Sequence, residues 1–302
     1  MSEAHLERYT NHDEQVTAEE LQFLKEHEPY LDFRIVSAEE VDLSRGRQSR
    51  VSVLEYDHGG ETYSVLWKRM AYEKGLTEEE ALKFESRINP YRQSLIHSGW
   101  NIPKVFFTKV CDMPDENQIF SYEQFIMGGD GEKLLADETQ PNFKKWFLIK
   151  EIARTLYNYP ASDLERTNID GVKLSRLSHG LDLKLANVVL EEKTNDLYFV
   201  DLFGPKELDG LGKWLTYSSK LDTLSEDKLL AVCATREGAL LRCWRLAENT
   251  WVNGYQSPEK LRAEFLIHLV EVGIANQEYQ FIKNEIENGY PWLDSIYQEK
   301  QI

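Results

Sequence analysis

The sequence predicts an α+β protein with two lobes, a small antiparallel β-sheet lobe with one helix and a larger, mainly helical lobe. Between positions 31 and 126, runs rich in β-branched and aromatic residues alternate with turn residues, as in strands joined by hairpins. A glycine-rich break follows at Gly128, Gly129 and Gly131. Beyond it, apolar residues recur mainly at the spacing of amphipathic helices. We therefore expect a helical extension at 1–30, a β-rich lobe at 31–126 and a helical lobe at 127–302.

The elements of the first lobe follow from local signals. Thr17-Ala18-Glu19-Glu20 reads as a capping box and predicts a helix over 17–28. Strands are expected at 32–41, 49–57 and 61–70, with Asp57-His58-Gly59-Gly60 as the turn between the last two. A helix over 77–88 should be capped by Thr77 and limited or kinked by Pro90. Two more strands are expected at 102–110 and 117–127.

The second lobe should be mostly helical, with one interruption. Amphipathic stretches predict helices over 142–159, from about 225 to 247, and from 258 to the end. The interruption is a hairpin whose strands lie at 187–192 and 197–201, around the turn Lys193-Thr194-Asn195-Asp196. Ligands tend to bind in the cleft between two such lobes, so we expect the functional site there.

Composition excludes several classes of function. The chain has 302 residues, of which 41% are hydrophobic and 12% aromatic, so wholesale disorder is excluded. Its 35 Lys and Arg against 52 Asp and Glu give a net charge of −17. A negative charge of this size repels phosphate backbones and anionic lipids, so we expect neither a nucleic-acid partner nor a membrane-docking surface.

Cysteine usage and the chain's start favour a reduced, cytoplasmic protein. The three cysteines include no Cys-x-x-Cys pair and are too few for a disulfide framework. The first residues are charged and lack the apolar stretch of a signal peptide. The longest apolar run, 229–234, falls far short of the roughly 20 residues that span a bilayer, so no transmembrane segment is expected. The sequence identifies no protein partner.

The candidate chemistry lies around the predicted hairpin of the second lobe. Asp182, on the loop before it, could accept a proton from an attacking hydroxyl group, and Lys184 could neutralise the charge of a phosphoryl group. Asn187 offers a neutral oxygen ligand and Asp201 an anionic one for Mg²⁺. Because Asn187 begins one strand and Asp201 ends its neighbour, the hairpin should place the two side by side.

A second candidate lies in the first lobe. Lys68 stands in a strand beside Leu66, on the face opposite Val65 and Trp67. A lysine in an apolar strand is costly to bury unless it is paired. The following helix carries a possible partner, Glu85. Such a pair could hold the ammonium group toward nucleotide phosphates.

Together these residues resemble the protein-kinase-like superfamily, nearest in layout to the aminoglycoside and choline phosphotransferases and the lipopolysaccharide kinases. The resemblance covers roughly positions 33–204, through Lys68, the string Asp-x-Lys-x-x-Asn at 182–187, and Asp201. It implies ATP and Mg²⁺ as cofactors, Asp182 as catalytic base with Lys184 beside it, and Asn187 and Asp201 as metal ligands. It also implies that Lys68, paired with Glu85, contacts the α- and β-phosphates.

Two further segments are assigned by the same resemblance. The stretch from Gln124 to Met127, which includes Phe125 and Ile126, would be the hinge whose backbone contacts adenine. The loop at 43–50 takes the place of the glycine-rich nucleotide loop, but it carries a single glycine. Its residues Arg45, Gly46 and Arg47 are candidates for binding phosphate or another anion through charge-assisted hydrogen bonds.

The resemblance implies a kinase that phosphorylates a hydroxyl group. No Ala-Pro-Glu-like anchor follows Asp201, which favours a small-molecule, saccharide or lipid-linked acceptor. Three alternatives stay open. Lys184, two residues after Asp182, is also typical of serine/threonine protein kinases. The motifs are stretched, with His179 three residues before Asp182, so a pseudokinase or regulatory nucleotide-binding module is the second alternative. A nucleotidyl transferase on the same fold is the third.

Overall fold

The chain divides into two units, each described by itself. The computed structural model describes residues 33–35, 49–58, 61–70, 78–113, 116–160, 164–169, 172–177, 180–202, 232–251, 255 and 257–298. The first unit runs to Arg87 and adds Pro103–Met127, and the second comprises Ile88–Ile102 and the chain from Gly128 on. The predicted helix at 17–28, the loop residues Arg45, Gly46 and Arg47, and His179 lie outside the described residues.

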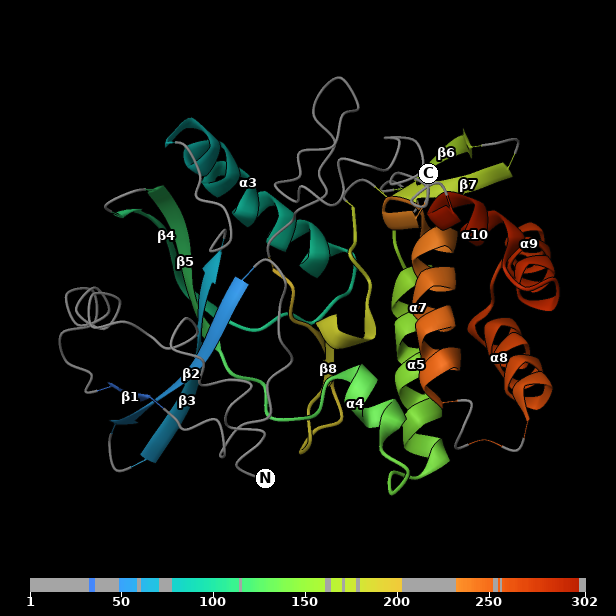
Figure 1. The fold of residues 1–302 in the computed structure, drawn as a ribbon, viewed down its shortest axis with the longest axis horizontal. Helices are drawn as coiled ribbons and strands as arrows, with labels where there is room; N and C mark the ends of the chain where they lie inside the picture. Colours follow the sequence, from blue (N-terminus) through green and yellow to red (C-terminus); the bar gives the residue numbers. More distant parts are fainter. Residues whose placement is uncertain are drawn as a thin grey trace. The chain divides into compact units, whose positions relative to one another are not determined.

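The first unit is built on a five-stranded antiparallel sheet (Figure 1). Its order is β1-β2-β3-β5-β4. The strands are β1 (Phe33–Ile35), β2 (Ser49–His58), β3 (Glu61–Met70), β4 (Val105–Met113) and β5 (Glu116–Gln124). All five correspond to strands that the sequence predicts, although the described part of the first is only three residues long. In β3, Val65 and Trp67 fall on one face and Leu66 and Lys68 on the other, and all four are buried.

Helix α3 (Glu78–His97) does not end at Pro90, which the sequence predicted to limit or kink it. Ile88, Tyr91 and Leu95 continue one buried stripe past the proline, so burial outweighs the lost backbone hydrogen bond. The helix ends instead in a Schellman motif. Trp100 N–H donates to Leu95 C=O and Gly99 N–H to Ile96 C=O, each at 3.0 Å, and Gly99 adopts φ 89°.

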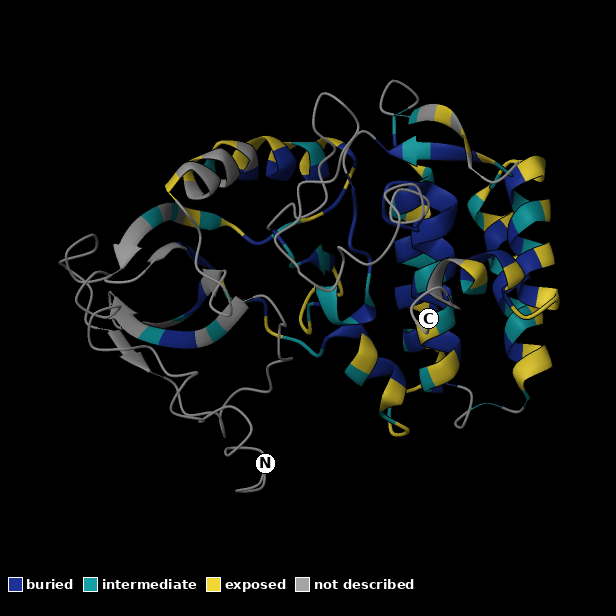
Figure 2. Ribbon diagram, turned by 45° about the horizontal axis from the view of Figure 1, so that its top comes forward, coloured by how far each residue is buried: buried dark blue, intermediate teal, exposed yellow. Residues whose placement is uncertain are grey.

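The second unit contains helices within or overlapping the stretches predicted at 142–159, at about 225–247 and from 258 on, and a short helix, α4 (Gly131–Ala136), that the sequence analysis did not predict. The others are α5 (Asn142–Tyr157), α7 (Arg236–Trp251), α8 (Pro258–Val272), α9 (Asn276–Glu287) and α10 (Pro291–Gln298). Helices α5 and α7 lie side by side and carry much of the buried surface of this unit (Figure 2). Trp244 stacks on Phe265 at 3.8 Å between ring centroids, and Trp146 meets Trp251 edge-on at 4.8 Å. Aromatic packing therefore joins α5, α7 and α8.

Two hairpins interrupt these helices, although the sequence predicted one. The predicted hairpin forms from β8 (Val188–Leu190) and β9 (Leu197–Phe199), preceded by the short 3₁₀ helix η3 (Leu185–Asn187). The other pairs β6 (Leu164–Ile169) with β7 (Val172–Leu177). The expectation of a single interruption was therefore wrong. The signal was present, because Asp170-Gly171 stands between the two strands and Asp-Gly is a preferred hairpin turn.

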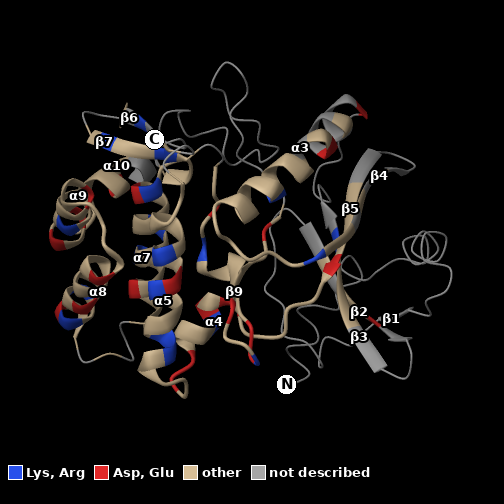
Figure 3. Ribbon diagram, turned by 180° about the vertical axis from the view of Figure 1, so that it is seen from behind, with Lys and Arg blue, Asp and Glu red and all other residues tan. Residues whose placement is uncertain are grey.

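Acidic and basic residues alternate on the outer helices of the second unit. Figure 3 shows both kinds of charge on α8 and on α9. Within these helices Lys260 lies 3.9 Å from Glu264, and Lys283 lies 3.7 Å from Glu287. Exposed pairs at this spacing add little stability but keep the faces polar. None of the helices that the structure describes combines the length and apolarity needed to cross a membrane.

Candidate functional site

The loop that carries Asp182 is anchored by every second residue. Leu181, Leu183 and Leu185 are buried, so the alternating side chains of Asp182 and Lys184 point away from that apolar anchor. The backbone of the loop is also tied to the segment that precedes α7, because Leu181 N–H donates to Cys233 C=O at 2.6 Å. The leucine pattern thus fixes where the two polar side chains stand.

The carboxylate of Asp182 lies between two cations. Lys184 Nζ is 2.6 Å from Oδ2, and Arg242 Nη1 is 2.5 Å from Oδ1. The aspartate is buried, and a buried carboxylate is tolerated when its charge is compensated and its oxygens accept hydrogen bonds. The predicted neighbours Asp182 and Lys184 are therefore brought together, and Arg242 joins them from α7.

Arg242 was missed in the sequence. It stands 60 residues from Asp182, and its neighbours Leu240, Leu241, Cys243 and Trp244 are all buried. An arginine inside such an apolar helix is itself a signal, because a cation in a buried stretch needs an anionic partner. The sequence could raise that question, but only the fold identifies the partner.

Asn187 links the Asp182 loop to the end of β9. Its Nδ2 donates to the backbone carbonyl of Asp182 at 2.8 Å and to Asp201 Oδ2 at 3.1 Å. The hairpin register explains the meeting, since Val188 pairs with Phe199 and Val200 N–H donates to Asn187 C=O at 2.9 Å. The expected placement of Asn187 beside Asp201 is thus observed.

These two side chains suit a hard cation. The Asn187 amide nitrogen donates to Asp182 C=O and to Asp201 Oδ2, and its Oδ1 makes no hydrogen bond with the residues that the structure describes. An amide oxygen beside a carboxylate is a donor set that Mg²⁺ accepts, with phosphates and water as its other ligands. Within the described ranges, no group of three or more His, Cys, Asp or Glu forms a metal site. A cation here would therefore need further ligands besides Asn187 and Asp201.

Lys68 belongs to the first unit, and its observed partner is Glu123. Lys68 Nζ is 2.7 Å from Glu123 Oε2, and both side chains are almost fully buried. The register pairs Lys68 with Ser121, whose hydroxyl donates to Glu123 Oε1 at 2.6 Å. The predicted pairing with Glu85 is not among the ion pairs of the described residues, and Glu85 lies partly buried on α3. The sequence analysis did not name Glu123 as the partner of Lys68. A glutamate in an apolar strand, like a lysine there, indicates a buried charge that needs a partner.

The predicted hinge lies directly after this pair. The backbone N–H of Gln124 donates to Lys104 C=O at 2.8 Å, and its side chain is exposed. Phe125 packs against an apolar cluster of Val53, Leu66 and Val51 on the Lys68 face of the sheet, and Ile126 is buried. The ion pair thus borders an apolar surface.

Comparisons with known proteins add little. No protein-family model matches the chain, and no curated protein sequence matches it. Among solved structures, it is similar to one described as "WaaP in complex with acyl carrier protein", at 11% identity and a TM-score of 0.45. That similarity covers 89% of this chain and 91% of the other. No family is shown by these values, and the residues described above carry the functional proposal.

Proposed function

We propose that the protein is a bilobal, protein-kinase-like enzyme that transfers the γ-phosphoryl group of ATP to a hydroxyl acceptor with Mg²⁺. The observation that carries the proposal is the double hydrogen bond of Asn187, which joins the Asp182 loop to Asp201. It places a candidate base and a candidate cation site on one support. Phosphoryl transfer depends on positioning and on cancellation of charge rather than on covalent chemistry, and this arrangement supplies both.

Asp182 is proposed as the catalytic base. Its carboxylate would accept the proton of the acceptor hydroxyl, which becomes the nucleophile. Lys184, half-exposed and 2.6 Å from Asp182, could turn toward the transferred phosphoryl group. Lys184 would then offset the negative charge that is spread over the phosphoryl oxygens.

Asn187 and Asp201 would hold the magnesium ion. When bound, the ion neutralises charge on the phosphate oxygens of the nucleotide. The protein's part is to orient its ligands, and here the Asn187 amide is fixed by the two hydrogen bonds that it donates.

The nucleotide contacts proposed for the first unit follow from its sheet. Lys68, oriented by Glu123, would bind the α- and β-phosphates, and Glu85 stays the second predicted partner of that lysine. The apolar surface formed with Phe125 would pack against adenine, and the backbone from Gln124 to Ile126 would donate and accept hydrogen bonds with it. The loop residues Arg45, Gly46 and Arg47 would contact phosphates.

A small molecule, a saccharide or a lipid-linked sugar is the proposed acceptor. Its support is in the sequence, because no Ala-Pro-Glu-like anchor follows Asp201. A protein acceptor is the alternative, and a panel of acceptors in the labelling experiment decides between them.

The test is to incubate the full chain with Mg²⁺ and ATP labelled at either the γ- or the α-phosphate, together with saccharides, lipid-linked sugars and protein substrates. We expect label to move to an acceptor from the γ position only. Transfer from the α position would show a nucleotidyl transferase instead. Binding of Mg·ATP without any transfer would favour a regulatory module.

The metal assignment is tested by Asp201→Ala, with Asp196→Ala in the exposed hairpin turn as the matched control. We expect Asp201→Ala to abolish the Mg²⁺-dependent part of the melting shift that ATP produces, because the only anionic ligand is lost. The control should keep the full shift. An unchanged shift in Asp201→Ala would remove that residue from the cation site.

A further inference from the structure

The carboxylate of Asp182 is bound by Arg242, a side chain of helix α7 outside the Asp182 loop. Lys184 holds Oδ2 and Arg242 holds Oδ1, so each carboxylate oxygen has a different partner. The two partners differ in exposure, since the Lys184 side chain is 41% exposed and that of Arg242 is 18%. Arg242 is therefore the more firmly placed of the two.

The start of α7 is also fixed by contacts that do not involve the Asp182 loop. Thr235 caps the helix, because its Oγ1 accepts from Gly238 N–H at 3.2 Å. Ahead of it, Leu177 N–H donates to Ala234 C=O at 2.7 Å, which ties the segment before the helix to β7. The helix that carries Arg242 thus begins at a tightly bonded point.

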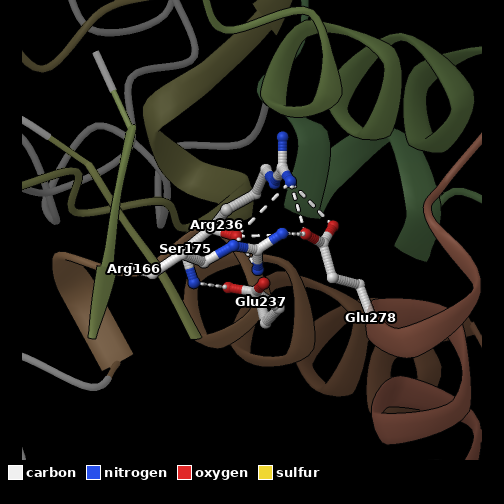
Figure 4. Close-up of polar contacts among 5 residues, drawn as sticks. All are labelled: Arg166, Ser175, Arg236, Glu237 and Glu278. Atoms are coloured by element: carbon white, nitrogen blue, oxygen red, sulfur yellow. Dashed lines mark hydrogen bonds and ion pairs between the residues drawn. The ribbon is translucent and has the colours of Figure 1, made fainter. Parts of the chain in front are cut away.

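Buried charges at the first turn of α7 add to this anchor (Figure 4). Arg236 Nη2 binds both carboxylate oxygens of Glu278 from α9, at 2.8 and 2.7 Å. Glu237, the next residue, accepts from Ser175 N–H in β7 at 2.9 Å. The Arg236 guanidinium also lies 4.3 Å from the centre of the Tyr157 ring of α5. Three other elements therefore hold the turn from which α7 extends toward Arg242.

We propose that Arg242 is a positioning residue for Asp182, anchored through the first turn of α7. This inference rests on the proposed kinase function. Arg242 fixes the rotation of the carboxylate by binding one oxygen through a charge-assisted hydrogen bond. The second oxygen is bound by Lys184. If Lys184 turns toward the phosphoryl group, the buried carboxylate still keeps Arg242 as its partner.

The kinetic test compares Arg242→Ala and Arg242→Lys with wild type, using the acceptor and γ-labelled ATP of the transfer assay. Arg245→Ala is the matched control, because Arg245 also forms an ion pair from α7, with Asp294. We expect Arg242→Ala to lower kcat at least tenfold while the KM for Mg·ATP stays unchanged. Added guanidinium ions should restore part of kcat in Arg242→Ala alone, and Arg242→Lys should retain an intermediate rate.

A second measurement does not depend on activity. Urea unfolding of Arg242→Ala, Asp182→Asn and the double variant gives the coupling between the two side chains. Additive effects would overturn the inference, and so would a full kcat in Arg242→Ala or an equal loss in Arg245→Ala. If wild type transfers no phosphoryl group while the coupling is present, the kinase proposal fails, and the positioning role fails with it. An active wild type whose Arg242→Ala variant is equally active would overturn the positioning role alone.

Discussion

Helix α7 contributes to two groups of buried charges that differ in how completely they are closed. At its first turn, Arg236 binds Glu278, and the side chains are 9% and 1% exposed. Further along, Arg242 binds Asp182 together with Lys184, whose side chain is partly exposed. Both groups compensate a buried carboxylate, and each includes an exposed cation, Arg166 beside Glu278 and Lys184 beside Asp182. They differ in the buried arginine, because Arg236 binds both oxygens of Glu278 whereas Arg242 binds one oxygen of Asp182 and leaves the other to Lys184.

The way each carboxylate is bound helps to distinguish a structural charge cluster from a candidate active site. In the first group the Glu278 carboxylate is saturated by Arg236, by Arg166 at 3.0 Å and by the Ser175 hydroxyl at 3.1 Å. Such a network contributes to a single well-defined packing. In the second, Lys184 can exchange partners. We therefore expect substitutions in the first group to change stability and those in the second to change activity as well as stability.

The largest expected effect is on activity, at Asp182. We expect Asp182→Asn to slow phosphoryl transfer by roughly 10²- to 10⁴-fold, the range for a lost general base, while Mg·ATP binding is nearly unchanged. Stability should fall as well, because the amide keeps the shape of the side chain but not the charge that Arg242 and Lys184 bind. Initial rates and a thermal melt with and without Mg·ATP check both parts. Normal turnover in this variant would remove Asp182 from the role of base.

The next effect is on stability, at Arg236. We expect Arg236→Met to lower the free energy of unfolding by about 3–5 kcal/mol, because it removes the buried partner of Glu278. Arg166→Met is the matched control, since Arg166 binds the same carboxylate but is 61% exposed. Its loss should cost no more than about 1 kcal/mol. Urea unfolding of the two variants measures the difference between their free energies of unfolding. Equal losses would show that Arg236 is no more important to the Glu278 cluster than the exposed Arg166.

Much of the fold can be predicted from the sequence, because hairpin turns and helical periodicity are local signals. The β8–β9 hairpin and the approach of Asn187 to Asp201 follow from one turn and its register. The partners of buried charges cannot be predicted in this way. Arg242 and Glu123 meet Asp182 and Lys68 through contacts between segments far apart in the sequence, and no local pattern specifies those contacts.

Misjudged elements have equally specific causes. The helix past Pro90 continues because Tyr91 and Leu95 are buried by the fold, a gain that the proline signal alone does not reveal. The β6–β7 hairpin was missed because its polar strands, with Arg166, Asn168 and Lys173 exposed, lack the apolar run typical of a strand. In the first case tertiary packing overrides the local pattern, and in the second the turn signal Asp170-Gly171 stands without an apolar run beside it.

The smallest expected effect is on the pH dependence of stability, at Glu237 in the first turn of α7. Burial raises the pKa of Glu237, and the nearby Glu278 adds to this, while the hydrogen bond from Ser175 N–H offsets part of it. A raised pKa of an acid means that its contribution to stability is present below the ordinary value and is lost as pH rises through the raised one. Glu237→Gln removes this titration and keeps an acceptor for Ser175. We therefore expect the variant to gain stability over wild type as pH rises through the raised pKa.

Glu259→Gln, in the first turn of α8, is the control of opposite sign for Glu237→Gln. Hydrogen bonds from its own backbone N–H and with Ser257 lower the pKa of Glu259. Its contribution to stability is therefore present above the ordinary pKa and is lost as pH falls through the lowered one. Unfolding measured from pH 4 to pH 8 should then show Glu237→Gln rising relative to wild type and Glu259→Gln falling. Parallel curves for the two variants would mean that the Glu237 carboxylate is ionised without cost, and the first turn of α7 would then be no more closed than the Asp182 group.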